Sequence, residues 1–341
     1  MDDEPRRLAP SFRALVVALL ATAAGAAYGL TGRLLLSKPE GVWAAMSIAF
    51  IFVMPFSMGF LATAICWIGG PLRWYARLTA PIAGATLALA ICMAMNLEGA
   101  ICIAIWSPLY MTLVVTGALM VEGIFQIRRA IRRRTQTFLC VFVGLLPYAT
   151  GVVESFHERT QEVRVVAESA TIRAPATIVW SEIREVRRID DSERHDTFTH
   201  AIGFPRPVEA RLVGEGIGAT RVARFEGNVL FIETIRAWDP GRLLSFSIRA
   251  DTEAIPATTL DEHVKVGGPY FDVLEGRFEI VPLQDGAVRL DLTSRHRLGT
   301  PFNFYAGLWT DFIMRDIQRE ILRIIRDRCE ARAQRGDSPP A

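Results

Sequence analysis

Apolar and charged positions are distributed unevenly along the chain. Over residues 11–153 charged residues occur almost only in short clusters, whereas from Glu154 onward a charged residue appears every few positions. Such a change marks a boundary between parts that fold in different surroundings. We therefore expect a transmembrane region, a linker, a folded domain and a disordered tail, over residues 1–154, 155–162, 163–333 and 334–341.

Five apolar stretches in the first part are long enough to be transmembrane helices. A helix needs about 20 mostly apolar residues to cross ~30 Å of hydrocarbon. The five stretches cover residues 12–30, 42–67, 78–95, 100–121 and 137–153. An ionisable residue inside a span often marks function, and Glu122, the one candidate here, is expected to pair with Arg128 or Arg129 near the interface. The sequence therefore gives little support for a transporter.

Arginines gather before the first stretch, after the second and before the fifth, as Arg6, Arg7, Arg13, Arg73, Arg77 and the run over 128–134. Because cytoplasmic loops carry the excess of positive charge, we expect a cytoplasmic N-terminus and a periplasmic or extracellular C-terminal domain. A cleaved signal peptide over residues 1–27 would leave that placement unchanged. Lysine is limited to Lys38 and Lys265, which suggests a bacterial source. We therefore expect a multi-pass inner-membrane protein.

Alternation of apolar and polar residues dominates the second part, as in Val288, Leu290 and Leu292 set against Arg289 and Asp291. A period of two is typical of half-buried strands. Seven strands are predicted, over residues 161–172, 208–213, 220–225, 229–238, 243–249, 270–281 and 287–298. Between the first two, a helix begins near 174–176 and a second short helix lies within 190–204. Strands in series, followed by a helix, indicate an α+β fold with an antiparallel sheet.

A long amphipathic helix is predicted over residues 303–332. Its apolar residues recur at three- and four-residue spacing, among them Tyr305, Trp309 and Phe312. At 1.5 Å per residue it would be about 45 Å long, enough to cross a small sheet. The domain is therefore expected to close with this helix laid over the sheet.

Several segments, in this order, resemble the helix-grip superfamily of START-like and polyketide cyclase/dehydrase-like proteins (SRPBCC). They are residues 170–180, 214–221, 233–243 and the closing helix. The resemblance implies a curved antiparallel sheet wrapped on a long C-terminal helix, around an apolar cavity that binds lipids, sterols, polyketides or other hydrophobic molecules. It covers about residues 163–331 and leaves out the apolar first part. It is specific for fold and not for activity.

Two ionisable residues are candidates for acid/base catalysis within this cavity. If Tyr270 and Phe278 face the helix, Asp272 shares that face, and His296 shares the inward face of the next strand. Burial would shift their pKa values into a useful range. Alternatively, and in our preferred interpretation, they only orient a ligand at the cavity mouth. The predicted ligand-binding residues are Tyr270, Asp272, Leu274, Phe278, Leu292, His296, Tyr305, Trp309 and Phe312.

Other features narrow the range of functions. Glu233 is expected to pair with an arginine of an adjacent strand, such as Arg224 or Arg249. His195 and His200 have no third ligand at recognisable spacing, so we expect no metal and no cofactor. A net charge of +2 gives no indication of a nucleic-acid partner, and the five cysteines form no CxxC motif. The glycines over 214–218 join two strands, unlike a phosphate loop.

Three functions are compatible with the sequence. The first is membrane-anchored binding of a hydrophobic ligand such as a lipid, isoprenoid or polyketide-like molecule. The second is an enzyme of the cyclase, dehydratase or hydrolase type that uses the same cavity. The third is a ligand-sensing module that regulates the membrane part. Binding without catalysis is favoured, and whether the protein is an enzyme stays open.

Overall fold

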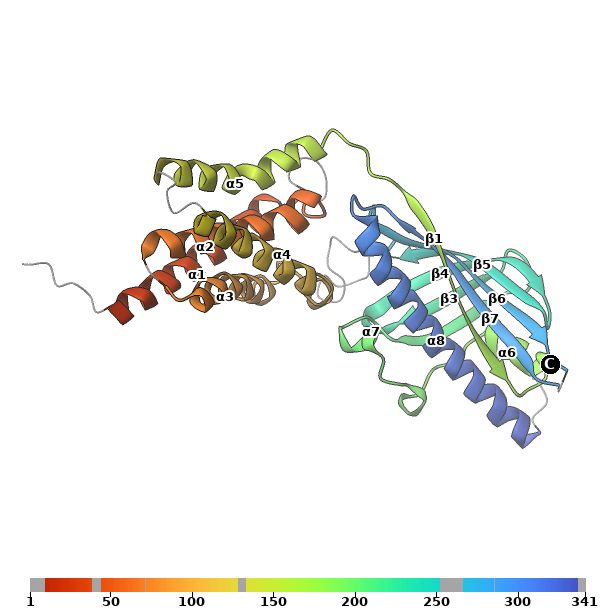
Figure 1. The fold of residues 1–341 in the computed structure, drawn as a ribbon. Coiled ribbons are helices and arrows are strands. Elements are labelled where there is room, and N and C mark those ends of the chain that lie inside the picture. The colour runs from red at the N-terminus through yellow and green to blue at the C-terminus, as the bar shows by residue number, and fades with distance from the viewer. Residues whose placement is uncertain are drawn as a thin grey trace, which may run out of the picture. The chain divides into compact units, whose positions relative to one another are not determined.

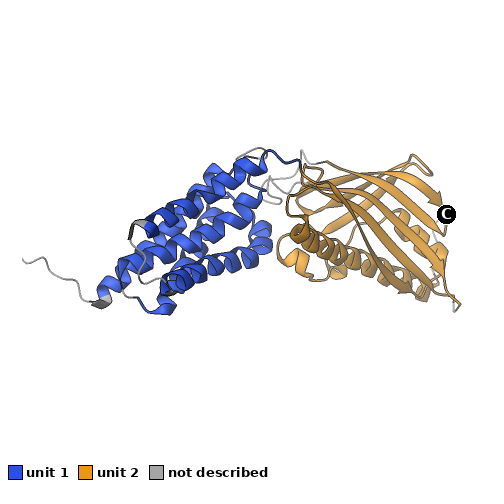
Figure 2. Cartoon of the chain, turned by 45° about the horizontal axis from the view of Figure 1, so that its top comes forward, with its two compact units in different colours: residues 1–158 blue, residues 159–341 orange. Residues whose placement is uncertain are grey.

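The computed structural model describes residues 10–38, 44–70, 72–127, 133–251, 266–284 and 286–336. Figure 1 shows the helices and strands. The chain forms two compact units, residues 1–158 and residues 159–341, which Figure 2 shows in separate colours. Separate clusters of buried apolar side chains lie within each unit. Each unit is therefore described by itself.

The first unit contains five helices that are long and apolar enough to cross a membrane. They are α1 (Pro10–Leu35), α2 (Met54–Gly69), α3 (Trp74–Ala94), α4 (Ala100–Ile127) and α5 (Arg133–Glu154), and a π-helical turn, η1 (Ala49–Val53), leads into α2. The predicted transmembrane region is confirmed, and the chain is a membrane protein.

Helices α2 and α4 approach each other closely at two glycines. A Cβ atom on Gly59 would lie 1.9 Å from the carbonyl oxygen of Val114, and one on Gly117 would lie 2.1 Å from that of Phe56. No side chain fits at either position. Such close packing stabilises the association of helices in lipid, where the hydrophobic effect does not drive them together.

Glu122 pairs with Arg77, on α3. The Nε and Nη2 atoms of Arg77 donate to the carboxylate of Glu122 at 2.5 and 3.0 Å, and the indole of Trp67 donates to the same carboxylate at 2.9 Å. The expected pairing with Arg128 or Arg129 involves residues outside the described ranges. Arg77 lies at the start of α3 and Glu122 near the end of α4, so the contact ties these two helices together.

The second unit is a seven-stranded antiparallel sheet with a long helix across one face (Figure 1). Its strands are β1 (Glu162–Ile172), β2 (Pro207–Val213), β3 (Thr220–Phe225), β4 (Val229–Asp239), β5 (Leu243–Asp251), β6 (Phe271–Pro282) and β7 (Val288–Leu298). Their order in the sheet is β1-β7-β6-β5-β4-β3-β2. The helices are α6 (Ala176–Arg184), α7 (Phe198–Ala201) and α8 (Asn303–Arg335), with single 3₁₀ turns η2 (Asp191–Glu193) and η3 (Glu226–Asn228). This arrangement confirms the predicted helix-grip fold.

The core of the second unit lies between the sheet, α6 and α8. Alternate residues of β7 are buried, including Leu290 and Leu292, which face Ile280 and Phe278 on β6. Helix α8 adds Leu322, Ile325 and Cys329 to the same cluster. The period of two in the strand and the spacing of apolar residues in the helix thus meet in one apolar layer.

A β-bulge in β6 changes which residues face this layer. Gly276 pairs with Ser294 and Val273 pairs with His296, so Leu274 is one extra residue. One extra residue reverses the alternation beyond it. Phe271 and Val273 therefore share the inner face with Phe278, and Asp272 pairs with Arg297 on the outer face. The expectation that Asp272 shares a face with Phe278 and His296 is wrong for this reason.

Gly276 lies directly beneath the ring of Phe246 on β5. A Cβ atom here would be 2.5 Å from Cε2 of that ring, which is 4% exposed and has little room to move. We expect Gly276→Ala to lower the free energy of unfolding by about 1–3 kcal/mol through overpacking. Thermal unfolding of the full chain in detergent measures this effect. In a Phe246→Leu background the same substitution should cost less, and an equal cost in both backgrounds would contradict the explanation.

Candidate functional site

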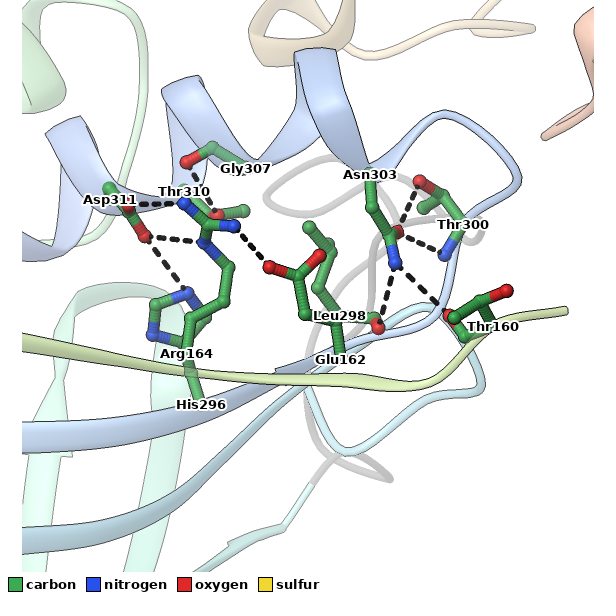
Figure 3. A network of polar contacts seen from close by, with 10 residues as sticks. All are labelled: Thr160, Glu162, Arg164, His296, Leu298, Thr300, Asn303, Gly307, Thr310 and Asp311. Atoms are coloured by element: carbon green, nitrogen blue, oxygen red, sulfur yellow. Dashed lines mark hydrogen bonds and ion pairs between the residues drawn. The ribbon is translucent and has the colours of Figure 1, made fainter.

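A polar network lies between the first half of α8 and the inner face of the sheet (Figure 3). Arg164 on β1 donates from Nε and Nη2 to the two carboxylate oxygens of Asp311 on α8, at 2.9 and 2.6 Å. His296 on β7 places Nε2 3.5 Å from Asp311 Oδ1. Glu162 also accepts a hydrogen bond from Arg164. Three elements thus meet at one carboxylate.

The strand register and a glycine bring these groups together. Arg164 and His296 are paired directly opposite each other in β1 and β7, so their side chains point to the same face. Gly307 lies four residues before Asp311, one turn earlier in α8, and a Cβ atom there would be 2.8 Å from Cζ of Arg164. The absence of a side chain at Gly307 lets the guanidinium lie against the helix.

The network determines the charge of its members. The hydrogen bonds from Arg164 lower the pKa of Asp311 below its ordinary value, against an opposing effect of burial. Burial lowers the pKa of His296; Asp311 opposes this shift and the Arg164 cation adds to it. At neutral pH the site therefore holds a carboxylate, a guanidinium and an uncharged imidazole.

His296 is fully buried, yet neither of its ring nitrogens has a hydrogen-bond partner among the described residues. A neutral imidazole carries one donor and one acceptor. Buried polar groups are nearly always hydrogen-bonded, and leaving one unpaired costs about 1–3 kcal/mol. The ring is therefore suited to binding a polar group that enters the site.

Gln318, which lies two turns after Asp311 on α8, supplies a second unpaired atom. Its amide nitrogen donates to Ser294 Oγ at 2.9 Å and to the Val166 carbonyl at 3.3 Å. Its Oε1 atom is buried and has no partner within the described part of the chain. Ser294 lies two residues before His296 on the inner face of β7. One orphaned group thus belongs to β7 and the other to α8, and both lie between the strand and the helix.

The structure does not bring Asp272 and His296 together, because the bulge turns them to opposite faces. Burial raises the pKa of Asp272, and Arg297, its partner across the strands, lowers it. The carboxylate near His296 is instead Asp311 on α8. The sequence could not identify Asp311 as the neighbour of His296, because that contact depends on how α8 is rotated about its own axis.

The other predicted ligand-binding residues fall into two groups. Phe278 and Leu292 are opposite each other in the apolar layer, and Tyr270 is 2% exposed, with Cζ of Arg159 4.7 Å from its ring centroid. Leu274 is the extra residue of the bulge. Tyr305, Trp309 and Phe312 lie on α8, and the rings of the last two contact Phe198 of α7.

Arg221 and Glu233 form a buried ion pair on the inner face of β3 and β4. They are paired in register, are 4% and 6% exposed, and are hydrogen-bonded through Arg221 Nη1. The expectation that Glu233 pairs with an arginine of an adjacent strand is confirmed, but the suggested Arg224 and Arg249 are wrong, because they lie on exposed positions of their strands. Burial raises the pKa of Glu233, and Arg221 opposes that shift. Cζ of Arg221 also lies 5.1 Å from the ring centroid of Phe246.

His200 on α7 and Glu320 on α8 form a second buried pair that sequence reasoning missed. His200 Nδ1 lies 3.0 Å from the carbonyl of Phe204 and Nε2 contacts the Glu320 carboxylate. Burial lowers the pKa of His200, but the bonds to Glu320 and Phe204 outweigh it, so the pKa is raised. Since both nitrogens face acceptors, a doubly protonated ring fits the site. Within the described ranges no group of three His, Cys, Asp or Glu residues is placed to hold a metal ion.

No family model and no curated protein matches the sequence. Solved structures do match. An aromatase/cyclase from Streptomyces sp. R1128 is 15% identical, and the match covers 52% of this chain and 100% of that chain with a TM-score of 0.32. A START superfamily protein from Mycobacterium smegmatis is 13% identical, and the match covers 49% of this chain and 97% of that chain with a TM-score of 0.32. A norcoclaurine synthase point mutant from Thalictrum flavum is 14% identical, and the match covers 50% of this chain and 98% of that chain with a TM-score of 0.29.

The strand order and the closing helix make the second unit a START-like helix-grip domain. At identities of 13 to 15% the similarity concerns the fold and carries over neither a ligand nor a functional residue. The site in this chain is therefore defined by its own contacts.

The charges around His296 lead to a pair of opposite predictions. In Arg164→Met the pKa of His296 should rise, because a nearby cation is removed while Asp311 stays. In Asp311→Asn it should fall further, because the opposing anion is removed. NMR titration of histidine-labelled full-length chain measures both, and the five histidines of the sequence limit the number of signals. Arg295→Gln, on the exposed face of β7, should change nothing; shifts of equal sign in the two variants would contradict the geometry.

Proposed function

We propose that this membrane protein binds a hydrophobic ligand between α8 and the inner face of the sheet in its helix-grip domain. The observation that carries the proposal is the pair of orphaned groups, His296 and Gln318 Oε1, which lie between α8 and β7 beside the apolar core. A ligand with a long apolar part and one polar end would satisfy both features. Lipids, isoprenoids and polyketide-like molecules have this character.

The roles of the residues follow from the same contacts. His296 would exchange a hydrogen bond with the ligand's polar end, as donor or acceptor, since its ring is neutral at pH 7. Gln318 Oε1 would accept a second hydrogen bond. The hydrocarbon part would lie against side chains such as Phe278 and Leu292. Burial and the Arg164 cation would keep the imidazole neutral.

The placement of the domain is part of the proposal. The arginine-rich segments before α1, before α3 and before α5 favour a cytoplasmic N-terminus by the positive-inside rule. With five spans, the helix-grip domain would then lie on the periplasmic or extracellular side. The anchor would hold the binding site close to a source of hydrophobic molecules.

Replacing His296 by leucine tests the binding function. Full-length protein is purified in detergent, extracted with organic solvent, and the molecules that co-purify are quantified per chain by mass spectrometry. We expect one class of molecule whose retention falls about fivefold in His296→Leu, because a hydrogen bond of ~1 kcal/mol is lost. The protein itself should be no less stable, since an unpaired polar group is removed.

Arg295→Gln is the matched control, because it changes a polar residue on the same strand at an exposed position. Its bound molecule should match that of the wild-type chain. If wild type, His296→Leu and Arg295→Gln all retain the same molecules in the same amounts, those are lipids bound to the membrane helices, and the proposal fails.

An acid/base enzyme is the second candidate. The supporting observation is the neutral, buried imidazole of His296, 3.5 Å from the carboxylate of Asp311. This imidazole can accept a proton from a bound substrate. Asp272 would have no part in it. If catalysis occurs, wild-type chain should retain product and His296→Gln should retain substrate, so the co-purifying molecules would differ in mass, by one water for a dehydratase. Identical masses in both proteins would argue for binding alone.

A further inference from the structure

An exposed apolar surface covers the first three turns of α8 and the adjacent α7. It consists of Phe198, Phe304, Leu308, Trp309 and Phe312, which we name the aromatic patch. Phe304 is 71% exposed, Leu308 67%, Phe312 42% and Phe198 47%. Residues 304, 308 and 312 are four apart, so they form one stripe along the helix. Contiguous apolar surface of this kind marks a contact with a partner or a membrane.

The patch is built as a unit and held in place. Phe198 stacks on Trp309 at a centroid distance of 6.3 Å and meets Phe312 edge-on at 5.6 Å. Asp316 of α8 accepts a hydrogen bond from the Thr199 backbone nitrogen at 3.0 Å. The buried His200–Glu320 pair joins the same two helices. Phe198 is therefore fixed against α8.

Apolar exposure is confined to one end of α8. Further along the helix the exposed positions are charged or polar, including Arg319, Arg323 and Asp327. An ordinary amphipathic helix that only covers a sheet would show charge along its whole outer side. The N-terminal third of α8 thus has an apolar side toward solvent in addition to its packed side.

That end of α8 lies where the chain enters the domain from the membrane helices. Asn303, next to Phe304, donates its side-chain amide to the Thr160 carbonyl at 3.0 Å (Figure 3). Only residues 155–161 separate the end of α5 from the start of β1. Seven extended residues span at most roughly 25 Å. A membrane that contains α5 therefore lies within reach of the aromatic patch.

We propose that the aromatic patch inserts into the surface of the lipid bilayer that anchors the chain. Aromatic side chains favour the boundary between headgroups and hydrocarbon, and an apolar stripe on a helix is the usual interfacial contact. The attraction is apolar rather than electrostatic. Arg315 and Arg319, the nearest arginines on the helix, both pair with Glu168, so their charges are compensated within the described part of the domain. Neutral lipid is sufficient.

A pair of spin labels on α8 tests the insertion. Full-length chain with its five native cysteines replaced by alanine carries a nitroxide at Leu308→Cys, or at Arg323→Cys as the matched position outside the patch. One chain per nanodisc is prepared in phosphatidylcholine. Collisions with oxygen should exceed collisions with a water-soluble nickel complex at residue 308 several-fold, and the order should reverse at residue 323. Adding an anionic lipid should change neither.

Two further substitutions make the result specific. Phe304→Asp changes a residue that is 71% exposed, so the fold is kept, and it should move the label at 308 toward the aqueous value. Arg323→Asp introduces the same group outside the patch and should have no effect on that label.

Three results would overturn the proposal. A label at 308 as aqueous as the label at 323 would show that the patch stays in water. A label shielded from both collision partners would show that protein covers the patch, and spin–spin broadening with two chains per disc would identify a second copy. Insertion only with anionic lipid would exclude an apolar contact as its cause.

Discussion

The position of α8 on the sheet is the constraint on which the second unit depends. Polar contacts hold the helix along its length, among them Asp311 with Arg164, Gln318 with Ser294, and Arg332 with Glu182. Leu322, Ile325 and Cys329 pack into the core between the last two contacts. Apolar packing alone is non-directional, whereas these hydrogen bonds define one rotation and one axial position of the helix.

That single placement creates both the candidate site and the aromatic patch. The side of α8 that faces the sheet brings Asp311 beside His296 and Gln318 over β7. In the first turns of the same helix, Phe304 and Leu308 stay exposed. A change in the rotation of α8 would therefore alter the polar groups inside and the apolar surface outside at the same time.

The other buried ion pairs stabilise the walls of the same unit. Arg221–Glu233 joins β3 to β4, and His200–Glu320 joins α7 to α8. Removing one partner of such a pair leaves an uncompensated charge and typically costs about 3–5 kcal/mol. Their retention in an apolar layer is consistent with a fixed geometry around the site, because few alternative arrangements would satisfy both charges.

The amino-acid sequence alone determined the five apolar helices, the run of antiparallel strands and the closing helix. These follow from hydrophobic length and from periods of 2 and 3.6, which depend on neighbouring residues only. It also indicated His296, because that residue continues the inward alternation of β7. Only the tertiary structure decided the partners: Asp311 rather than Asp272 beside His296, Arg221 for Glu233, and Arg77 for Glu122. One extra residue at Leu274 reversed a strand face, and residues up to 157 positions apart were brought into contact, neither of which a local pattern contains.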